Sequence, residues 1–144
     1  MLTTRRRALL VIAACCLSAI GSGPAPAQDP RGTAAQTQAL AWLALTDHGD
    51  AAASWRASGK LFQNAITVDK WAEALRQVRP QLGDVVERSV QSTQITKNIP
   101  GAPDGDYALL VFRSSFANKT DSSEHVTLQL EADGVWRVIG YFIR

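Results

Sequence analysis

Two charged side chains, Arg88 and Glu124, stand on strand faces that are otherwise apolar. Every second residue of a β-strand points to the same side, so Arg88 shares its face with two valines and Glu124 shares its face with a valine and two leucines. Because an unpaired buried charge is very costly, we expect these two side chains to pair. The strand spacing of a simple meander puts both roughly opposite Ser115, which predicts a bridge through its hydroxyl or through water.

Two interpretations of this polar cluster stay open. It is either a structural cluster at the end of the sheet or the floor of a pocket in which Glu124 is a tuned acid. Tyr107 joins the candidates because a tyrosine hydroxyl can act as an oxyanion donor in such a pocket. The candidate site residues are Arg88, Ser115, Glu124 and Tyr107.

Other kinds of chemistry have little support. The two histidines, His48 and His125, lie 77 residues apart and neither belongs to a metal-ligand spacing. The sequence has no G-x-S-x-G elbow, no glycine-rich phosphate loop and no lysine–arginine cluster interleaved with aromatic residues. We therefore expect no cofactor, no metal ion and no nucleic-acid partner. The four tryptophans have apolar neighbours at same-face spacing, which predicts core positions.

Residues 1–27 have the pattern of a secretory signal peptide. Three arginines precede an apolar run from Ala8 to Ile20, and small residues follow as far as Ala27. The apolar run is too short to span a bilayer, which takes about 20 residues. We expect cleavage after Ala27 and a periplasmic or secreted protein. Without the arginine triplet, 12 basic and 13 acidic side chains remain.

Cys15 supports an alternative to soluble export. The run Ile12-Ala13-Ala14-Cys15 fits a lipobox, in which Cys15 is lipidated and anchors the protein to a membrane. Cleavage after Ala27 would remove both cysteines and leave neither a thiol nor a disulfide. We favour soluble export and retain the lipoprotein as the alternative.

The rest of the chain has the length of one domain. We predict a flexible leader at 28–32 and a single domain at 33–144. Capping patterns predict three helices, which begin at Thr33, after Asp50 and near Thr67. Pro80 is expected to end the third helix close to Arg79.

The second half of the chain changes to a period of two, which indicates strands. They are predicted at 84–97, 107–116, 124–131 and 135–143, with a hairpin at Asp133-Gly134. The expected fold class is α+β, with three N-terminal helices packed on a curved four-stranded antiparallel sheet. The expected core contains Leu43, Trp71, Leu75, Leu110, Phe112, Leu128 and Trp136.

Several short motifs together point to a known family. They are Arg79-Pro80-Gln81-Leu82-Gly83, Pro100-Gly101 with Pro103-Asp104-Gly105-Asp106-Tyr107, and Asp133-Gly134-Val135-Trp136-Arg137-Val138. From about residue 36 to residue 143 the chain resembles the exported bacterial domain-of-unknown-function family 4019. The resemblance implies a cell-envelope location and a cone-like fold similar to the nuclear-transport-factor-2 superfamily. It supplies no catalytic residues.

Two classes of function remain, besides a lipoprotein that acts by its position on the membrane. The favoured one is a non-catalytic module that binds a small apolar ligand or an envelope protein. The alternative is a cofactor-free isomerase or cyclase, in which Asp47 or Glu124 is the cavity base and Tyr107 a donor. General acid–base catalysis needs at least two positioned groups, and nothing in the sequence aims these residues at one another. We therefore expect that the protein is not an enzyme.

Overall fold

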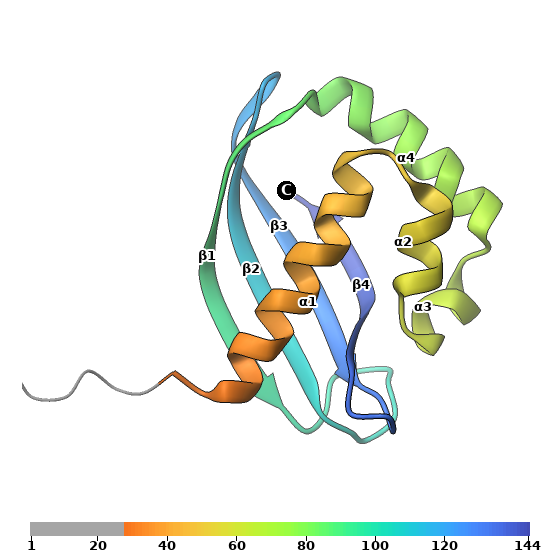
Figure 1. Ribbon diagram of the computed structural model, residues 1–144, viewed down its shortest axis with the longest axis vertical. Helices are drawn as coiled ribbons and strands as arrows, with labels where there is room; N and C mark the ends of the chain where they lie inside the picture. The colour runs from red at the N-terminus through yellow and green to blue at the C-terminus, as the bar shows by residue number, and fades with distance from the viewer. Residues whose placement is uncertain (1–27) are drawn as a thin grey trace, which may run out of the picture.

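The computed structural model describes residues 28–144. The predicted signal peptide, the cleavage site after Ala27 and the lipobox at Cys15 lie outside the described residues. Within the described range, four helices form a layer over one face of a four-stranded sheet (Figure 1). The predicted α+β class is confirmed. No helix among residues 28–144 is long and apolar enough to cross a membrane.

The sheet is an antiparallel meander with its strands in chain order, as predicted. The strands are β1 (Val85–Thr96), β2 (Tyr107–Phe116), β3 (Lys119–Leu130) and β4 (Trp136–Ile143). β3 begins five residues before the predicted strand because a two-residue turn joins it to β2 and Phe116 already pairs with Lys119. The Asp133-Gly134 hairpin is present, and Gly134 has the positive φ of 79° that this turn requires.

The first helix, α1 (Pro30–Asp47), begins three residues before the predicted start at Thr33. The side chain of Asp29 accepts a hydrogen bond from the backbone N–H of Arg31 at 2.9 Å, and Pro30 takes the first helical position. A capping residue followed by proline is a strong start signal, and it precedes the capping box that the sequence also offers. Residues 30–32 of the predicted leader therefore belong to α1.

A fourth helix was not predicted. α2 (Ala51–Ala57) begins after Asp50, as expected, but it is followed by α3 (Lys60–Ala65). The residue that precedes α3 is Gly59, which has no side chain for capping. The backbone N–H of Lys60 instead donates to the Glu131 carboxylate at 2.9 Å. Because this cap comes from a residue 71 positions away, no local pattern could reveal the helix.

The last helix, α4 (Val68–Leu82), runs two residues past Pro80, so the predicted end near Arg79 is wrong. A proline in the last turn removes only one helical hydrogen bond and does not stop the helix there. The helix ends at Gly83, which has a φ of 75° and donates its N–H to the Arg79 carbonyl at 3.0 Å.

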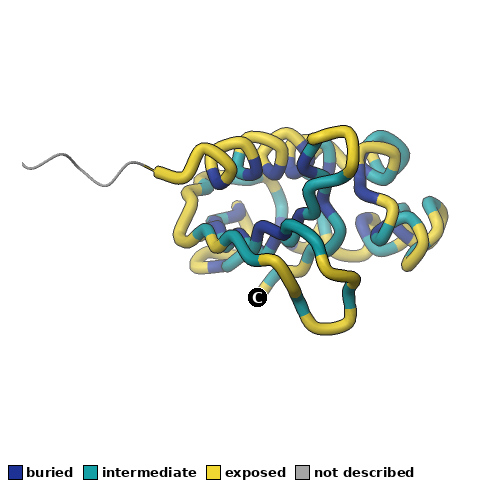
Figure 2. Tube along the Cα trace, turned by 90° about the horizontal axis from the view of Figure 1, so that it is seen from below, coloured by how far each residue is buried: buried dark blue, intermediate teal, exposed yellow. Residues whose placement is uncertain are grey.

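The core lies between the helix layer and the sheet, and Figure 2 shows buried residues facing the space between the two layers. All seven predicted core residues are buried there. The tryptophans are largely core residues, as expected. The indole N–H of Trp42 donates to the Ser54 carbonyl, and that of Trp71 donates to the Ser54 hydroxyl, each at 2.9 Å.

Candidate functional site: a buried charge cluster and an apolar groove

Four charged side chains meet where the helix layer covers the sheet. We call them the charge cluster: Asp47, Arg79, Arg88 and Glu124. Arg88 donates to Glu124 from Nε at 2.6 Å and from Nη2 at 3.1 Å. The Glu124 side chain has no exposed surface, and Arg88 is 10 % exposed. The pairing expected from the sequence is therefore present, in a bidentate geometry that suits a buried ion pair.

The helix ends supply the other half of the charge cluster. Arg88 also donates to Asp47 from Nη1 at 2.7 Å and from Nη2 at 3.0 Å. Arg79 contacts the same carboxylate from Nη1 at 2.9 Å and donates to the Thr46 hydroxyl at 2.7 Å. The sequence had offered Asp47 only as a possible base, and it did not predict the contact of Arg79 with Asp47. The four formal charges sum to zero.

Two hydroxyl groups complete the coordination of Glu124. Ser114 donates to Oε2 at 2.5 Å, and Tyr141 donates to Oε1 at 2.6 Å. With the two bonds from Arg88, the carboxylate accepts four hydrogen bonds, which is about its full capacity. It has no free lone pair for a substrate proton.

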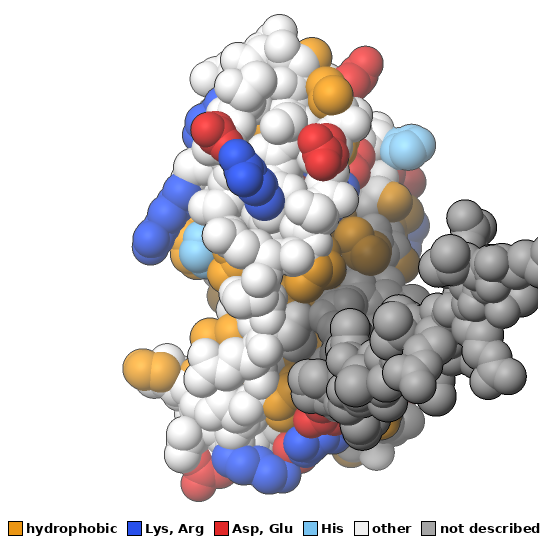
Figure 3. Space-filling view, turned by 90° about the vertical axis from the view of Figure 1, so that its left-hand side faces the viewer, with side chains coloured by type: hydrophobic (Ala, Val, Ile, Leu, Met, Phe, Trp, Pro, Cys, Tyr) orange, Lys and Arg blue, Asp and Glu red, His pale blue; other side chains and the backbone are white. Residues whose placement is uncertain are grey.

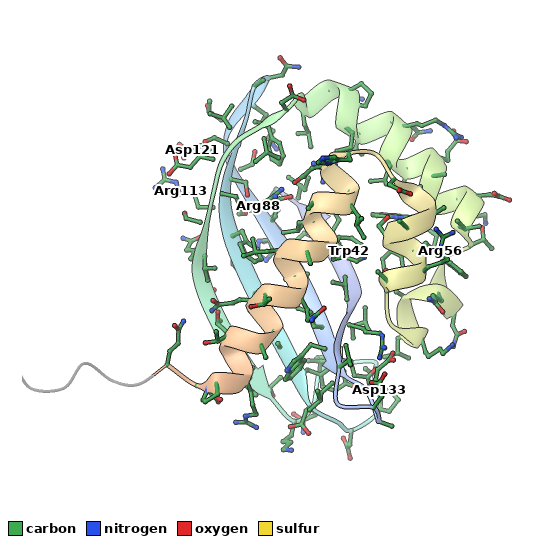
Figure 4. All side chains as sticks on the ribbon, viewed as in Figure 1. Trp42, Arg56, Arg88, Arg113, Asp121 and Asp133 are labelled. Atoms are coloured by element: carbon green, nitrogen blue, oxygen red, sulfur yellow. The ribbon has the colours of Figure 1, made fainter. Side chains whose placement is uncertain are left out.

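The charge cluster links elements that are distant along the chain. Asp47 ends α1 and Arg79 lies in the last turn of α4, while Arg88, Ser114 and Glu124 come from three neighbouring strands. Figure 4 shows Arg88 pointing from the sheet toward α1. Since each side chain holds a different element, the cluster fixes the helix layer on the sheet.

The surroundings shift the pKa values of Arg88, in the charge cluster, and of Tyr141 beside it. Burial lowers the pKa of the Arg88 guanidinium, but its hydrogen bonds to Asp47 and Glu124 outweigh burial and raise that pKa above its ordinary value. Burial, followed by the charge of Glu124, raises the pKa of the Tyr141 hydroxyl above its ordinary value. Both groups therefore stay protonated at neutral pH, as hydrogen-bond donors to carboxylates.

The structure corrects the prediction for Ser115. Arg88 lies opposite Ser114, whereas Ser115 pairs with Glu87 and faces the other side of the sheet. The pairing of Thr96 with Tyr107, continued along β1, would put Arg88 opposite Ser115, but a bulge between Val90 and Ser92 shifts the register of β1 against β2. A shift of one residue exchanges the two faces of a strand, so Ser114 takes the place predicted for Ser115.

Tyr107 does not belong to the charge cluster. It lies at the opposite end of β2, where its hydroxyl donates to the Pro103 carbonyl and accepts from Gln129 at 3.4 Å. The hydroxyl in the cluster comes from Tyr141. The sequence places Tyr141 in the last predicted strand, which is rich in aromatic residues. Its hydrogen bond to Glu124 could not be predicted, because it depends on the register of β4 against β3.

An apolar groove adjoins the charge cluster, between α4 and the end of β4. It has a volume of about 300 Å³, at the lower end of the roughly 300–1,000 Å³ of ligand sites. Val78 and Phe142, at 43 % and 46 % exposure, are large apolar side chains open to solvent. We call this the α4–β4 groove; its lining residues are Trp71, Ala74, Leu75, Val78, Arg79, Tyr141, Phe142 and Ile143.

Charges elsewhere on the surface do not gather into one patch on the face that can be seen. Figure 3 shows the side that carries β1, where basic and acidic side chains are interspersed. The pair Arg113–Asp121 is an example, at 2.7 Å and with both side chains more than two-thirds exposed. Among residues 28–144, no group of three or more His, Cys, Asp or Glu side chains is arranged to hold a metal ion.

The chain is an α+β domain whose charge cluster and groove lie where α1 and α4 cover the sheet. It belongs to the family described as Protein of unknown function (DUF4019), which matches residues 38–141. The match confirms the family suggested by the sequence motifs and includes all four residues of the charge cluster. No curated protein and no solved structure matches the chain. The likeness to the nuclear-transport-factor-2 superfamily stays a prediction.

Proposed function

We propose that this protein is an exported, non-catalytic binding module that receives an apolar group in the α4–β4 groove. The occupant is a small apolar ligand or an apolar segment of a cell-envelope protein. Export is supported by the sequence pattern of residues 1–27. If Cys15 is lipidated instead, the same module would act at a membrane surface.

The observation that carries the proposal is the state of Glu124. A general base must present a lone pair to the substrate, but Glu124 is fully buried and accepts four hydrogen bonds from Arg88, Ser114 and Tyr141. Asp47, the other candidate base, accepts two hydrogen bonds from Arg88 and contacts Arg79. Both carboxylates offered for a cofactor-free isomerase are thus held in structural ion pairs. The neighbouring groove is apolar and open to solvent, which is what a binding site requires.

The binding proposal is tested with the fluorescent dye 1-anilinonaphthalene-8-sulfonate. We expect saturable binding that is at least about tenfold weaker in Val78→Asp, because a carboxylate in the groove disfavours an apolar guest. The matched control is Val86→Asp, at a residue of β1 that is 71 % exposed and does not line the groove. Equal binding by Val78→Asp and the unchanged protein would disprove the assignment of the groove.

The enzyme alternative has its own test. Hydrolysis and isomerisation of small ester and enone substrates are measured for the unchanged protein and for a folded Glu124→Gln variant. We expect no turnover above the buffer rate by either protein. Turnover that the substitution abolishes would show that Glu124 is catalytic and would overturn the non-catalytic proposal.

A further inference from the structure

The last residues of β4 form an open sheet edge beside the α4–β4 groove. Within residues 28–144, β4 is an outer strand that pairs with β3 alone. Ser123 and Arg144 exchange both of their backbone hydrogen bonds, at 3.0 and 2.9 Å. Since hydrogen-bonded pairs alternate along an antiparallel ladder, the N–H and C=O groups of Tyr141 and Ile143 point away from β3.

These four outward groups have no backbone partner in the described part of the chain. Earlier in the strand the edge is closed, because Gly59 donates its N–H to the Val138 carbonyl at 2.7 Å. The unpaired stretch of the β4 edge therefore begins after Val138, the residue that Gly59 contacts. An unpaired strand edge of this kind can accept an added strand.

The groove determines two side chains of such an added strand. A residue that exchanges hydrogen bonds with Tyr141 or Ile143 lies opposite it and points its side chain to the same face. Tyr141 faces the helix-covered side, since its hydroxyl donates to Glu124. The two opposing side chains thus enter the groove against Leu75 and Val78 of α4, and apolar side chains fit there.

The residue between these two points to the opposite face of the sheet, next to Phe142 and Arg144. The Phe142 ring stacks on His125 with centroids 4.4 Å apart, and the Arg144 guanidinium lies 5.1 Å from the Phe142 ring centroid. After burial, the charge of Arg144 is the second cause that lowers the pKa of His125. Charge complementarity with Arg144 favours an acidic side chain at this middle position.

We propose that the open edge of β4 binds an extended segment of a partner protein with the pattern apolar–acidic–apolar, as an added antiparallel strand. This inference rests on the proposed function, because it names the occupant of the same groove. A second copy of the chain fits less well. Three residues of open strand supply a small part of the roughly 1,600 Å² that a stable protein interface buries.

The probe is the acetylated and amidated pentapeptide Thr-Val-Glu-Val-Thr, titrated into ¹⁵N-labelled protein. We expect saturable chemical-shift changes with a Kd of about 1 mM or tighter. At saturation, the amide protons of Tyr141 and Ile143 should exchange with solvent at least about tenfold more slowly, because each gains a hydrogen bond.

Two matched peptides separate strand addition from plain apolar binding. The same peptide with its second valine N-methylated should bind about tenfold more weakly, since it loses one main-chain hydrogen bond. The peptide Thr-Val-Lys-Val-Thr should bind more weakly than the parent at low salt, because it places a cation beside Arg144.

Two protein variants test the same geometry from the other side. Ile143→Pro removes an N–H that points away from β3, so the ladder stays intact while the added strand loses a donor. We expect it to abolish peptide binding, as Val78→Asp should by filling the groove with charge. Val86→Asp should bind like the unchanged protein. If Ile143→Pro does not fold, the N-methylated peptide gives the same test on the unchanged protein.

The outcomes distinguish the two proposals. Equal binding of the parent and N-methylated peptides, or shift changes confined to other strands, overturns strand addition. If the dye binds in the groove but the peptide does not bind, strand addition is overturned and the proposed function stands. If neither the dye nor the peptide binds, the proposed function is overturned as well. A concentration-dependent dimer that Ile143→Pro dissolves would assign the edge to a second copy and overturn the peptide proposal.

Discussion

Replacing Glu124 by Gln keeps the size of the side chain and removes its charge, which makes it a direct probe of the charge cluster. In the unchanged protein, the Glu124 carboxylate accepts two hydrogen bonds from Arg88 and one each from Ser114 and Tyr141. An amide has one oxygen and one NH₂ group, so its nitrogen must face donors at one of the two positions.

The magnitude follows from which donor is left without an acceptor. The Ser114 and Tyr141 hydroxyls can rotate and accept from the new NH₂ group, but the amide nitrogen faces Nε of Arg88 in one orientation and Nη2 in the other, and neither can accept a hydrogen bond. In either orientation Arg88 loses a hydrogen bond to residue 124 and keeps only Asp47 as a counter-charge within its hydrogen-bond contacts. Removing one partner of a buried pair costs about 3–5 kcal/mol, so we expect that loss in the free energy of unfolding.

The assay is equilibrium unfolding in urea at pH 7, followed by tryptophan fluorescence. At about 4 °C per kcal/mol, the same loss lowers the melting temperature by roughly 12–20 °C. The matched control is Asp121→Asn, which removes the charge of an ion pair to Arg113 of 2.7 Å, close to the 2.6 Å of Arg88–Glu124, on the exposed face of the sheet (Figure 4). Because exposed pairs contribute about 0–1 kcal/mol, this control should change stability little.

A loss under about 1 kcal/mol in Glu124→Gln, equal to that in Asp121→Asn, would refute the reasoning. It would mean that the charge of Glu124 is not needed to compensate Arg88 in the folded state. A crystal structure of the variant showing Arg88 turned out to solvent would identify the cause.

Three further predictions concern pH and processing. The pKa of Tyr141 is raised, so its contribution to stability is present below about pH 10 and is lost as the pH rises above it; Tyr141→Phe should show a shallower alkaline loss in urea unfolding. The pKa of His125 is lowered from 6.5 by burial and then by Arg144, so its contribution is present above that value and is lost as the pH falls; NMR titration should give a pKa below 6.5 that rises in Arg144→Gln. Sequencing of exported protein should begin at Gln28, and a lipidated start at Cys15 would contradict cleavage after Ala27.

Local signals determined much of the fold from the sequence alone. The side chain of Asp50 caps α2 as predicted, and α4 begins near Thr67 as predicted, with the Thr67 side chain as its cap; a capping residue acts on backbone N–H groups two or three positions away. The Asp133-Gly134 turn acts over a similarly short range. Alternation within β3 was enough to turn Glu124 inward, since the period of two is a property of the extended backbone. In β1 the predicted apolar face is wrong, because Val86 and Val90 beside Arg88 are exposed and two bulges interrupt the period.

The tertiary structure decided what depends on register and docking. A bulge in β1 selected Ser114 over Ser115, and a cap from Glu131 made α3 possible. Asp47 and Arg79 reached the charge cluster because the ends of α1 and α4 dock over the same part of the sheet. A one-residue shift in register exchanges the two faces of a strand, and docking joins residues far apart in the chain. The sequence thus determined that the buried acidic side chain of Glu124 needs a basic partner. The packing of helices on the sheet decided which neighbours complete the hydrogen bonds of this pair.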